Sequence, residues 1–347
     1  RGGGRAGWFG AGPRAPRDAA ALAAAARRHA GRVAFWEFAQ WCFFRQWKAL
    51  RAYANGRGVR IVGDVPIFVA HHSAECWAHP ELFELDAAGR RTVVAGVPPD
   101  LFSATGQHWG NPLYRWPAHA AQGYAWWIER IRRTFELVDV ARIDHFRGFA
   151  AYWEIPGGEP TAMNGRWMPG PGKALFDAVA AALGPLPIIA EDLGVITPDV
   201  DALRRELGLP GMRILQFAWG EADGSANRYL PHNHEPDTVC FTGSHDNDTA
   251  IGWWAAAPEL VRDHVRRYFA TDGADIAWDL IRAAFASVAD TAMVPMQDVL
   301  RLSGAHRMNL PGTGHGNWGW RFDWADLGPD TAAELLRATV LYGRLKA

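Results

Sequence analysis

The sequence predicts an α/β fold of the (β/α)8 TIM-barrel type, and two patterns carry this prediction. Six short apolar runs, rich in β-branched residues, alternate with stretches of helical periodicity, which is typical of parallel strands joined by crossover helices. Three of the runs end abruptly in acidic residues. Because catalytic acids at the ends of several strands favour a barrel over an open, doubly wound sheet, the barrel is our first interpretation and the open sheet the alternative.

The first expected element is a helix over residues 35–53, where apolar residues recur at roughly helical spacing and residues 55–58 supply a stop signal. The first buried strand follows over 60–68. Five more strands are expected at 138–143, 187–190, 212–217, 239–242 and 292–297, with helices at 121–137, 172–183, 198–207 and 258–270. Six strands are two fewer than a closed eight-stranded barrel contains, so we predict an incomplete barrel.

Two regions are expected along the chain. Residues 1–58 are interpreted as an N-terminal low-complexity and helical insertion segment, and residues 59–347 as the remainder of a catalytic barrel with inserted loops. The Gly-rich opening at residues 1–5 leads into an Ala/Arg/Gly/Pro-rich stretch that lacks the apolar core of a signal peptide. It also lacks the strand-loop-helix context of a phosphate-binding loop, so a nucleotide-binding enzyme is not expected.

Bulk properties argue against several kinds of partner. The formal net charge is -1 over 347 residues, and the aromatic residues are not interleaved with basic runs, so no nucleic-acid partner is expected. No stretch is long and apolar enough to span a bilayer, so no membrane partner is expected. The three cysteines have no Cys-x-x-Cys spacing, which predicts neither a disulfide framework nor a zinc site and fits a cytoplasmic location. The oligomeric state does not follow from these properties.

Tryptophan is the compositional outlier, with 18 residues in the chain. Most of them are expected in the core, because a large aromatic side chain contributes much buried area. Trp109, Trp167, Trp318 and Trp320 lie instead in Gly/Pro/Asn-rich segments. Flat apolar faces in loops suit the apolar faces of sugar rings, so these segments are candidates for carbohydrate contact.

The candidate catalytic residues are the acids at the ends of three runs: Asp144, Glu191 and Asp246. A single acid after a strand is more often a solvated loop residue or a helix N-cap. Three in series, one preceded by Arg142 and another by His245, favour a catalytic cluster at the C-terminal ends of parallel strands.

The segments around these acids resemble the amylomaltases, the 4-α-glucanotransferases of the α-amylase superfamily. The matching segments are 63–69, 102–114, 142–148 (Arg-Ile-Asp-His-Phe-Arg-Gly), 190–194 (Ala-Glu-Asp-Leu-Gly), 241–249 (Phe-Thr-Gly-Ser-His-Asp-Asn-Asp-Thr), 307–312 and 316–321. The resemblance implies that Asp144 is the nucleophile, Glu191 the general acid/base and Asp246 the residue that grips the distorted sugar.

The residue types suit this chemistry. Cleavage of an α-1,4 bond with retention needs a carboxylate and a protonated carboxyl about 5 to 5.5 Å apart. Arg142 lies two residues before Asp144 on the same face of a strand, so it can hydrogen-bond the nucleophile and keep it ionised. Glu191 must stay protonated near neutral pH, which requires partial burial and the nearby charge of Asp144. Asp192 is interpreted as a structural acid.

Chemistry alone leaves Asp246 open as a metal ligand, a solvated acid or a substrate clamp. Its pairing with His245 and the family resemblance favour hydrogen bonds to sugar hydroxyls. Asp64 is structural by default, although it resembles a residue that lines the same sugar subsite. No cofactor and no metal site are expected, because no ligand cluster is present in the sequence.

The resemblance also implies two lid-like acceptor loops. Their expected substrate-binding residues are Gln107, Trp109, Asn111 and Tyr114 in the first loop, and Asn309, Pro311, Asn317 and Trp318 in the second. Loops that exclude water and bind a sugar hydroxyl would direct the glucosyl-enzyme intermediate to a glycan acceptor. An ordinary flexible connection remains the alternative for the second loop.

Amylomaltases have a further N-terminal stretch, with two barrel strands and a substrate-contacting Tyr, to which this sequence has no counterpart. We therefore expect a fragment covering about the C-terminal two-thirds of the family, with the strand of Asp64 at a free sheet edge. The predicted function is a retaining 4-α-glucanotransferase that moves α-1,4-glucan segments from maltodextrin or maltooligosaccharide donors to glucose or another glucan. The alternatives are an α-amylase-like hydrolase and an inactive glucan-binding fragment.

Overall fold

The structure is a computed structural model that describes residues 18–99, 103–220 and 224–345. It is a mixed α/β fold in two compact units, Arg1–Leu209 and Pro210–Ala347, and each has its own three-stranded parallel sheet. The predicted low-complexity stretch at residues 1–17 lies outside the described residues, as does Phe102 of the second matching segment. The predicted division near residue 58 stays a prediction.

The parallel sheet of the first unit consists of β1 (Val62–Pro66), β4 (Val140–Asp144) and β7 (Ile188–Ala190), in the order β1-β4-β7. Pro66 pairs with Asp144, and Ile143 with Ala190, so the C-terminal ends of the three strands lie at one edge. All residues of β4 before Asp144 and all of β7 are buried, as the apolar runs predict. Within the described part of the chain β1 is an edge strand, as expected.

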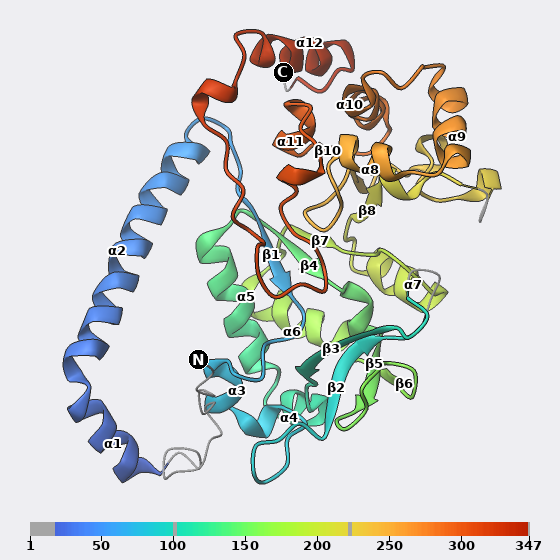
Figure 1. The fold of residues 1–347 in the computed structure, drawn as a ribbon. Helices are drawn as coiled ribbons and strands as arrows, with labels where there is room; N and C mark the ends of the chain where they lie inside the picture. Colours follow the sequence, from blue (N-terminus) through green and yellow to red (C-terminus); the bar gives the residue numbers. More distant parts are fainter. Residues whose placement is uncertain (1–17, 100–102, 221–223, 346–347) are drawn as a thin grey trace, which may run out of the picture. The chain divides into compact units, whose positions relative to one another are not determined.

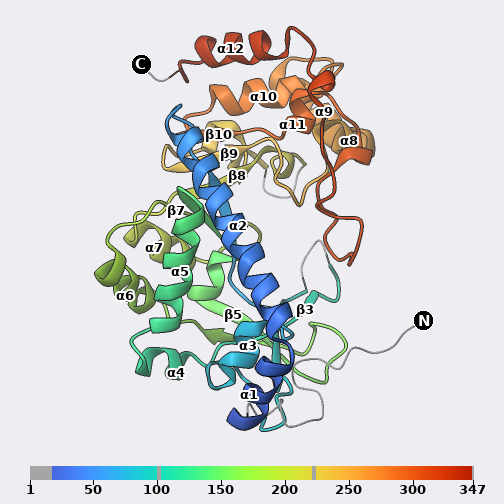
Figure 2. The same cartoon turned by 90° about the vertical axis from the view of Figure 1, so that its left-hand side faces the viewer.

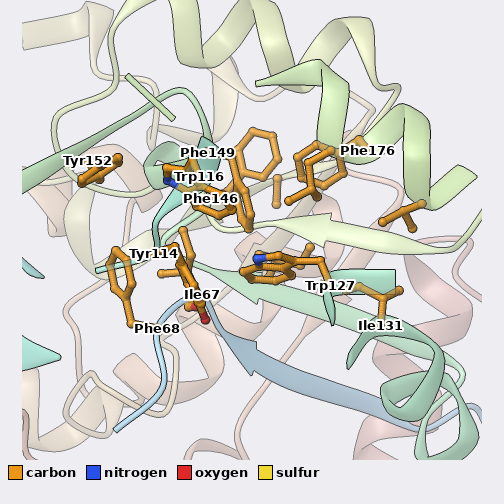
Figure 3. Packing of buried hydrophobic residues seen from close by; sticks show 14 of the residues in the cluster. Ile67, Phe68, Tyr114, Trp116, Trp127, Ile131, Phe146, Phe149, Tyr152 and Phe176 are labelled. Atoms are coloured by element: carbon orange, nitrogen blue, oxygen red, sulfur yellow. The ribbon is translucent and has the colours of Figure 1, made fainter. Parts of the chain in front are cut away.

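Helices pack beside this sheet (Figure 1), together with a cluster of buried aromatic residues. α5 (Ala125–Leu137) contacts β1, β4 and α6 (Lys173–Leu183), and α7 (Pro198–Glu206) follows β7. Figure 3 shows Tyr114, Trp116, Trp127, Phe149 and Phe176 packed together among the buried residues of the unit. The short helices α3 (Ala74–Ala78) and α4 (Trp116–Ala121) contribute Cys76 and Trp116 to the same core. The core thus lies beside the strands that carry the candidate acids.

A four-stranded antiparallel sheet in the first unit corrects the expectation that residues 107–114 form a loop. Its strands, in the order β3-β2-β5-β6, are β2 (Val93–Val97), β3 (Gln107–Pro112), β5 (Ala151–Pro156) and β6 (Arg166–Pro169). The sequence does not predict β3, because Gly110 and Pro112 lie within it and both residue types are disfavoured in strands. Proline is tolerated here because β3 is an edge strand.

The predicted helix at 35–53 is confirmed and is longer than expected. α1 (Ala19–Arg28) leads into α2 (Ala30–Asn55), the long blue helix of Figures 1 and 2. The C-terminal part of α2 is fixed where Trp47 Nε1 donates to the Leu137 carbonyl at 2.7 Å and Arg51 Nε donates to Asp139 Oδ1 at 2.8 Å. Many of its other aromatic side chains are exposed.

The second unit has a parallel sheet of β8 (Gly211–Ile214), β9 (Thr238–Phe241) and β10 (Thr291–Met293), in the order β10-β9-β8. Its helices are α8 (Ala250–Ala256), α9 (Glu259–Phe269), α10 (Ile276–Ala286), α11 (Met296–Val299) and α12 (Thr331–Leu341). The fully buried α10 residues Trp278, Leu280 and Ile281 form the centre of its core.

All six expected strands are present and parallel, three in each unit. Most are shorter than predicted, and the first, expected over 60–68, is confined to Val62–Pro66. The run at 212–217 leaves the sheet after Ile214 and continues as a 3-10 turn, and the run at 292–297 ends at Met293 because Pro295 precedes α11. In the described ranges, no helix is both long and apolar enough to cross a membrane.

Candidate active site

Arg142 holds two carboxylates at the C-terminal edge of the first parallel sheet. Asp64 pairs with Arg142 across β1 and β4, and Arg142 Nη1 lies 2.7 Å and 2.8 Å from the two Asp64 oxygens. Arg142 Nη2 lies 2.9 Å from Asp144 Oδ1, which confirms the predicted contact. The Arg142 side chain is 10% exposed, whereas Asp64 and Asp144 are 40% and 39% exposed. The buried guanidinium of Arg142 therefore holds two carboxylates, those of Asp64 and Asp144, that are themselves accessible to solvent.

The alternation of side chains along a strand explains this arrangement. Residues 142 and 144 lie two positions apart on β4, so both side chains point to the same face. Burial alone would lower the pKa of Arg142, but the charges of Asp144, Asp64 and Glu191 hold that pKa above its ordinary value. The guanidinium therefore stays charged beside the two aspartates.

Glu191 follows β7 and is half-buried, with its carboxyl group held by two backbone N–H groups. The N–H of His145 donates to Oε2 at 2.6 Å, and the N–H of Leu193 donates to Oε1 at 2.8 Å. Burial and the negative charge of Asp144 raise the pKa of Glu191 to about 7, against the opposing effects of Arg142 and the two N–H donors. A pKa of about 7 leaves a substantial share of Glu191 protonated near neutral pH, which is the state that the predicted general acid needs.

His145 is a site residue that the sequence interpretation missed. It adopts a left-handed conformation with φ 52°, which turns the chain after β4 and aims its N–H at Glu191. Its buried ring packs edge-on against Trp109, with 4.7 Å between the ring centroids. Burial and the charge of Arg147 lower the pKa of His145 to about 3, so the ring is neutral. Its position directly after a strand-end acid is the signal that could have identified it.

Asp192, the neighbour of Glu191, is fully buried and lies opposite Arg204 of α7. The Arg204 Nε atom is 3.6 Å from Asp192 Oδ2, and Arg204 Nη1 donates to the Leu209 carbonyl at 2.8 Å. An ion pair so far from solvent cannot contact a substrate. The expected structural role of Asp192 is therefore consistent with its position.

The predicted residues of the first acceptor segment separate into an exposed pair and two supporting residues. Gln107 and Trp109 are exposed on β3, and Trp109 Nε1 donates to Gln107 Oε1 at 3.1 Å. Asn111 instead donates through Nδ2 to the Val69 carbonyl at 3.0 Å. Tyr114 requires a correction, because it is 1% exposed and its hydroxyl donates to the Ile67 carbonyl at 2.7 Å. Its side chain belongs to the core.

In the second unit, Asp246 lies in the connection between β9 and α8 and is exposed. Asn309 Nδ2 donates to Asp246 Oδ1 at 2.6 Å, and Arg307 Nη2 donates to the Asp246 backbone carbonyl at 2.9 Å. His245 Nε2 lies 3.4 Å from Asp246 Oδ2, so the two neighbouring side chains pair as expected. The sequence interpretation identified Asn309 but missed Arg307, which lies two residues earlier in the same matching segment.

The second predicted acceptor loop is held together by hydrogen bonds between its own residues. Asn317 Oδ1 accepts from the Leu310 N–H at 2.9 Å and its Nδ2 donates to the Thr313 carbonyl at 3.1 Å, so Asn317 supports the loop itself. Its contact with substrate stays a prediction. Trp318 is 62% exposed, and its ring centroid lies 5.0 Å from that of His245. Pro311 is exposed at the tip.

The structure thus brings the predicted residues into two clusters. Asp64, Arg142, Asp144 and Glu191 form one cluster in the first unit, and His245, Asp246, Asn309 and Trp318 form the other in the second unit. In the part of the chain that the structure describes, no group of three His, Cys, Asp or Glu residues is arranged to hold a metal ion.

Comparisons with known proteins agree on one family. The sequence profile of the 4-alpha-glucanotransferases matches residues 4–326. The chain is 51% identical over 331 residues to a 4-alpha-glucanotransferase of Thermus thermophilus, covering 93% of this chain and 66% of that protein. It is 50% identical over 313 residues to a chloroplastic/amyloplastic 4-alpha-glucanotransferase of Arabidopsis thaliana, covering 88% of this chain and 54% of that one.

Solved structures extend the likeness to three dimensions. An amylomaltase from Streptococcus agalactiae in complex with acarbose superposes with a TM-score of 0.91 at 39% identity, covering 94% of this chain and 66% of that one. An amylomaltase from Corynebacterium glutamicum, at 19% identity and a TM-score of 0.67 over 82% of this chain and 45% of that one, shares the fold. The chain spans 54% and 66% of the length of the two curated relatives described above.

Proposed function

Because the chain belongs to the 4-alpha-glucanotransferase family, we propose that it carries the catalytic groups of a retaining 4-α-glucanotransferase. The observation that carries the proposal is the arrangement of Asp144 and Glu191. The Asp144 carboxylate lies beside a buried guanidinium, and burial and the charge of Asp144 raise the pKa of Glu191 to about 7. Two carboxyl groups in opposite protonation states are what double displacement at a sugar requires.

In the first half of the proposed reaction, Asp144 attacks the anomeric carbon of an α-1,4-linked glucosyl unit. The bond from that carbon to the glycosidic oxygen breaks, and Glu191 donates its proton to the leaving oxygen. In the second half, ionised Glu191 takes a proton from a hydroxyl of the acceptor glucan, whose oxygen displaces Asp144. Two inversions give net retention, and both side chains return to their starting states.

The remaining acids and aromatic residues are proposed as substrate contacts. Asp246, with His245 beside it, would accept hydrogen bonds from sugar hydroxyls that shorten as the ring flattens. Asp64 would do the same at the β1 edge. The exposed rings of Trp109 and Trp318 offer apolar faces to sugars of the donor or acceptor. Pro311 and Asn309 remain proposed contacts of the second loop.

The proposed substrates are α-1,4-glucans and maltooligosaccharides as donors, with glucose or another glucan as acceptor. We also propose that the two parallel sheets are parts of an incomplete (β/α)8 barrel. Supporting observations are the parallel pairing of all six strands, the acid that ends β4 and the acids that follow β7 and β9. A cytoplasmic location remains the prediction from the cysteine content.

Incubation of the complete protein with maltotriose tests the proposal. Transfer gives a ladder of longer and shorter oligomers together with glucose. Formation of glucose and maltose alone would indicate an α-amylase-like hydrolase instead, and retention on a maltodextrin column without turnover would indicate a glucan-binding module.

Exhaustive chelation before the same assay tests the expectation that no metal is needed. Unchanged transfer is expected because the proposed chemistry uses carboxyl groups only. A loss that calcium specifically restores would contradict this and favour the α-amylase-like alternative.

A further inference from the structure

Asp298 of α11 is a buried acid that the proposed chemistry does not use. It is 1% exposed, and each of its carboxylate oxygens accepts one hydrogen bond. The Thr242 hydroxyl donates to Oδ2 at 2.6 Å, and the Ala250 N–H donates to Oδ1 at 2.7 Å. Thr242 directly follows β9, and Ala250 is the first residue of α8. One carboxylate therefore closes both ends of the connection that carries Asp246.

We propose that Asp298 is a positioning residue for Asp246. Asp298 fixes the place of the 242–250 loop and does not itself touch the substrate. The inference rests on the proposed function, because Asp246 has a task only if a sugar binds beside it. Thr242 and Ala250 are themselves fully buried, so neither donor has water as an alternative partner. Breaking either bond leaves a polar group unsatisfied in the core, which strongly favours the closed arrangement.

The loop between these two ends is itself held together by hydrogen bonds. Asn247 Oδ1 accepts from the N–H and the hydroxyl of Ser244, both at 2.9 Å. Gln216 Nε2 donates to the Asp248 carbonyl at 2.8 Å. Because the interior of the loop is braced, a shift at its ends moves Asp246 with it rather than being absorbed locally.

The residue before Asp298 anchors the other side of the Asp246 contact. Gln297 Nε2 donates to the His306 carbonyl at 3.1 Å, three residues before Asn309, whose amide holds Asp246 Oδ1 at 2.6 Å. Adjacent residues of α11 thus hold both the loop of Asp246 and the segment of its amide partner. This common anchor is why we assign the positioning role to α11 and not to β9 or α8.

Asp279 provides a matched control within the same unit. It is also a buried acid, at 9% exposure, and its Oδ2 also accepts from a threonine hydroxyl, that of Thr271, at 2.8 Å. Asp279 braces the connection between α9 and α10 instead of the 242–250 loop. Loss of either acid removes a buried hydrogen-bonded carboxylate, but only one of them touches the loop of Asp246.

The experiment measures kcat and KM for maltotriose transfer, together with the Tm, in Asp298→Ala, Asp298→Asn and Asp279→Ala. We expect Asp298→Ala to lower kcat about tenfold to a hundredfold, because a misplaced group loses that much. Asp298→Asn should stay within about threefold of wild type, since its amide oxygen can accept from Ala250 and the Thr242 hydroxyl can rotate to accept from Nδ2. Asp279→Ala should lower the Tm and leave kcat within about threefold.

A double-variant cycle separates positioning from general stability. If Asp298 acts through Asp246, adding Asp298→Ala to Asp246→Asn should slow the reaction by less than about threefold more, because the aligned group is already lost. An activated glycosyl fluoride donor keeps the slow reaction of the Asp246→Asn variants measurable. Fully multiplicative losses in the double variant would overturn the inference, as would equal kcat values for Asp298→Ala and Asp279→Ala.

Thr242→Val decides the question if Asp298→Ala does not fold. It removes one of the two bonds and is isosteric, so we expect a kcat loss of about threefold to tenfold that disappears in the Asp246→Asn background. An unchanged kcat would overturn the inference. A wild-type protein that transfers nothing from maltotriose would instead refute the proposed function, so the two failures are distinguishable.

Discussion

At the scale of single residues, the buried Arg142 links the carboxyl groups of the first cluster. Its guanidinium is shared between Asp64 and Asp144, and its field also reaches Glu191, whose pKa it lowers. Burial and the Asp144 charge act in the opposite direction and are the stronger effects, which is why the pKa of Glu191 still rises to about 7. The raised pKa of Glu191 therefore comes from its surroundings.

Asp144→Asn and Glu191→Gln should each reduce maltotriose transfer by several orders of magnitude while the far-UV circular dichroism spectrum stays unchanged. The two groups act as a unit in double displacement, so losing either blocks turnover. Asp177→Asn is the control, because Asp177 is an exposed acid of α6 in the same unit that forms an ion pair with Lys173 along the helix. Near-normal transfer in Asp144→Asn would end the assignment of the nucleophile.

The pH dependence of kcat/KM should show an alkaline limb set by Glu191. Its pKa is about 7, so kcat/KM should fall about tenfold per pH unit above that value as the proton donor is lost. In Asp144→Asn, carbon-13 NMR of the Glu191 carboxyl should show a lower pKa, because the charge that helps to raise it is gone. A flat profile to pH 9 would contradict the role of Glu191 as the acid.

The free energy of unfolding should also depend on pH through Glu191. The pKa of Glu191 is raised from 4.5 to about 7 in the folded chain, so its stabilising contribution is complete below about pH 4.5 and is lost as the pH rises to 7. Glu191→Gln stays neutral throughout. Urea unfolding should therefore show the variant gaining, relative to wild type, on the order of 2 kcal/mol between pH 4 and 8. A difference independent of pH would refute the shift.

At the scale of elements, the sequence predicts the regular parallel strands but not the irregular strand β3 or the hydrogen bonds within loops. The six parallel strands were recognisable because buried strands are continuous apolar runs, and Asp144 and Glu191 because each acid follows such a run. The strand β3 was not recognisable, because glycine and proline interrupt the pattern of side chains that marks a strand. Tyr114 was assigned to a loop by its Gly/Pro-rich surroundings, although tertiary packing places it in the core. Loop hydrogen bonds such as those of Asn317 leave no pattern in a single sequence.

Gly96→Ala should disturb the β2 and β3 pair that carries Trp109. A Cβ atom at this buried position would collide with the Gln107 backbone carbonyl and approach Ile155 Cδ1 to 2.6 Å. We expect a loss of about 1–3 kcal/mol in urea unfolding, together with weaker maltotriose binding, because the backbone of β3 must shift. Gly158→Ala is the control, since a Cβ there meets nothing within 4 Å. Equal stabilities for the two variants would show that the strands adapt freely.

At the scale of the whole molecule, the chain has two compact units, each with a separate hydrophobic core. The candidate acids are divided between them: Asp144 and Glu191 belong to one unit and Asp246 to the other. The long helix α2 stands out in the first unit because Phe35, Trp36 and Phe38 are more than half exposed. Apolar patches of this kind commonly mark surfaces that pack against other polypeptide.

The 347-residue chain by itself should therefore self-associate through α2. Sedimentation velocity at micromolar concentrations should show oligomers, and replacing Phe35, Trp36, Phe38 and Trp41 with lysine should shift the population to the monomer, because charged side chains disfavour apolar association. Lysine substitutions at exposed Ala and Gln positions of the same helix are the control. A wild-type chain that is monomeric at all concentrations tested would contradict the prediction.

The shared guanidinium has a further consequence, which concerns the electrostatic balance of the proposed catalytic cycle. With Glu191 protonated, the set Asp64, Arg142, Asp144 and Glu191 carries one net negative charge. Formation of the glucosyl ester neutralises Asp144, while departure of the proton leaves Glu191 ionised, so the total is unchanged. The negative charge only moves from one carboxyl to the other. Glu191 then loses the neighbour that raised its pKa, so it remains ionised until the acceptor hydroxyl returns a proton to it.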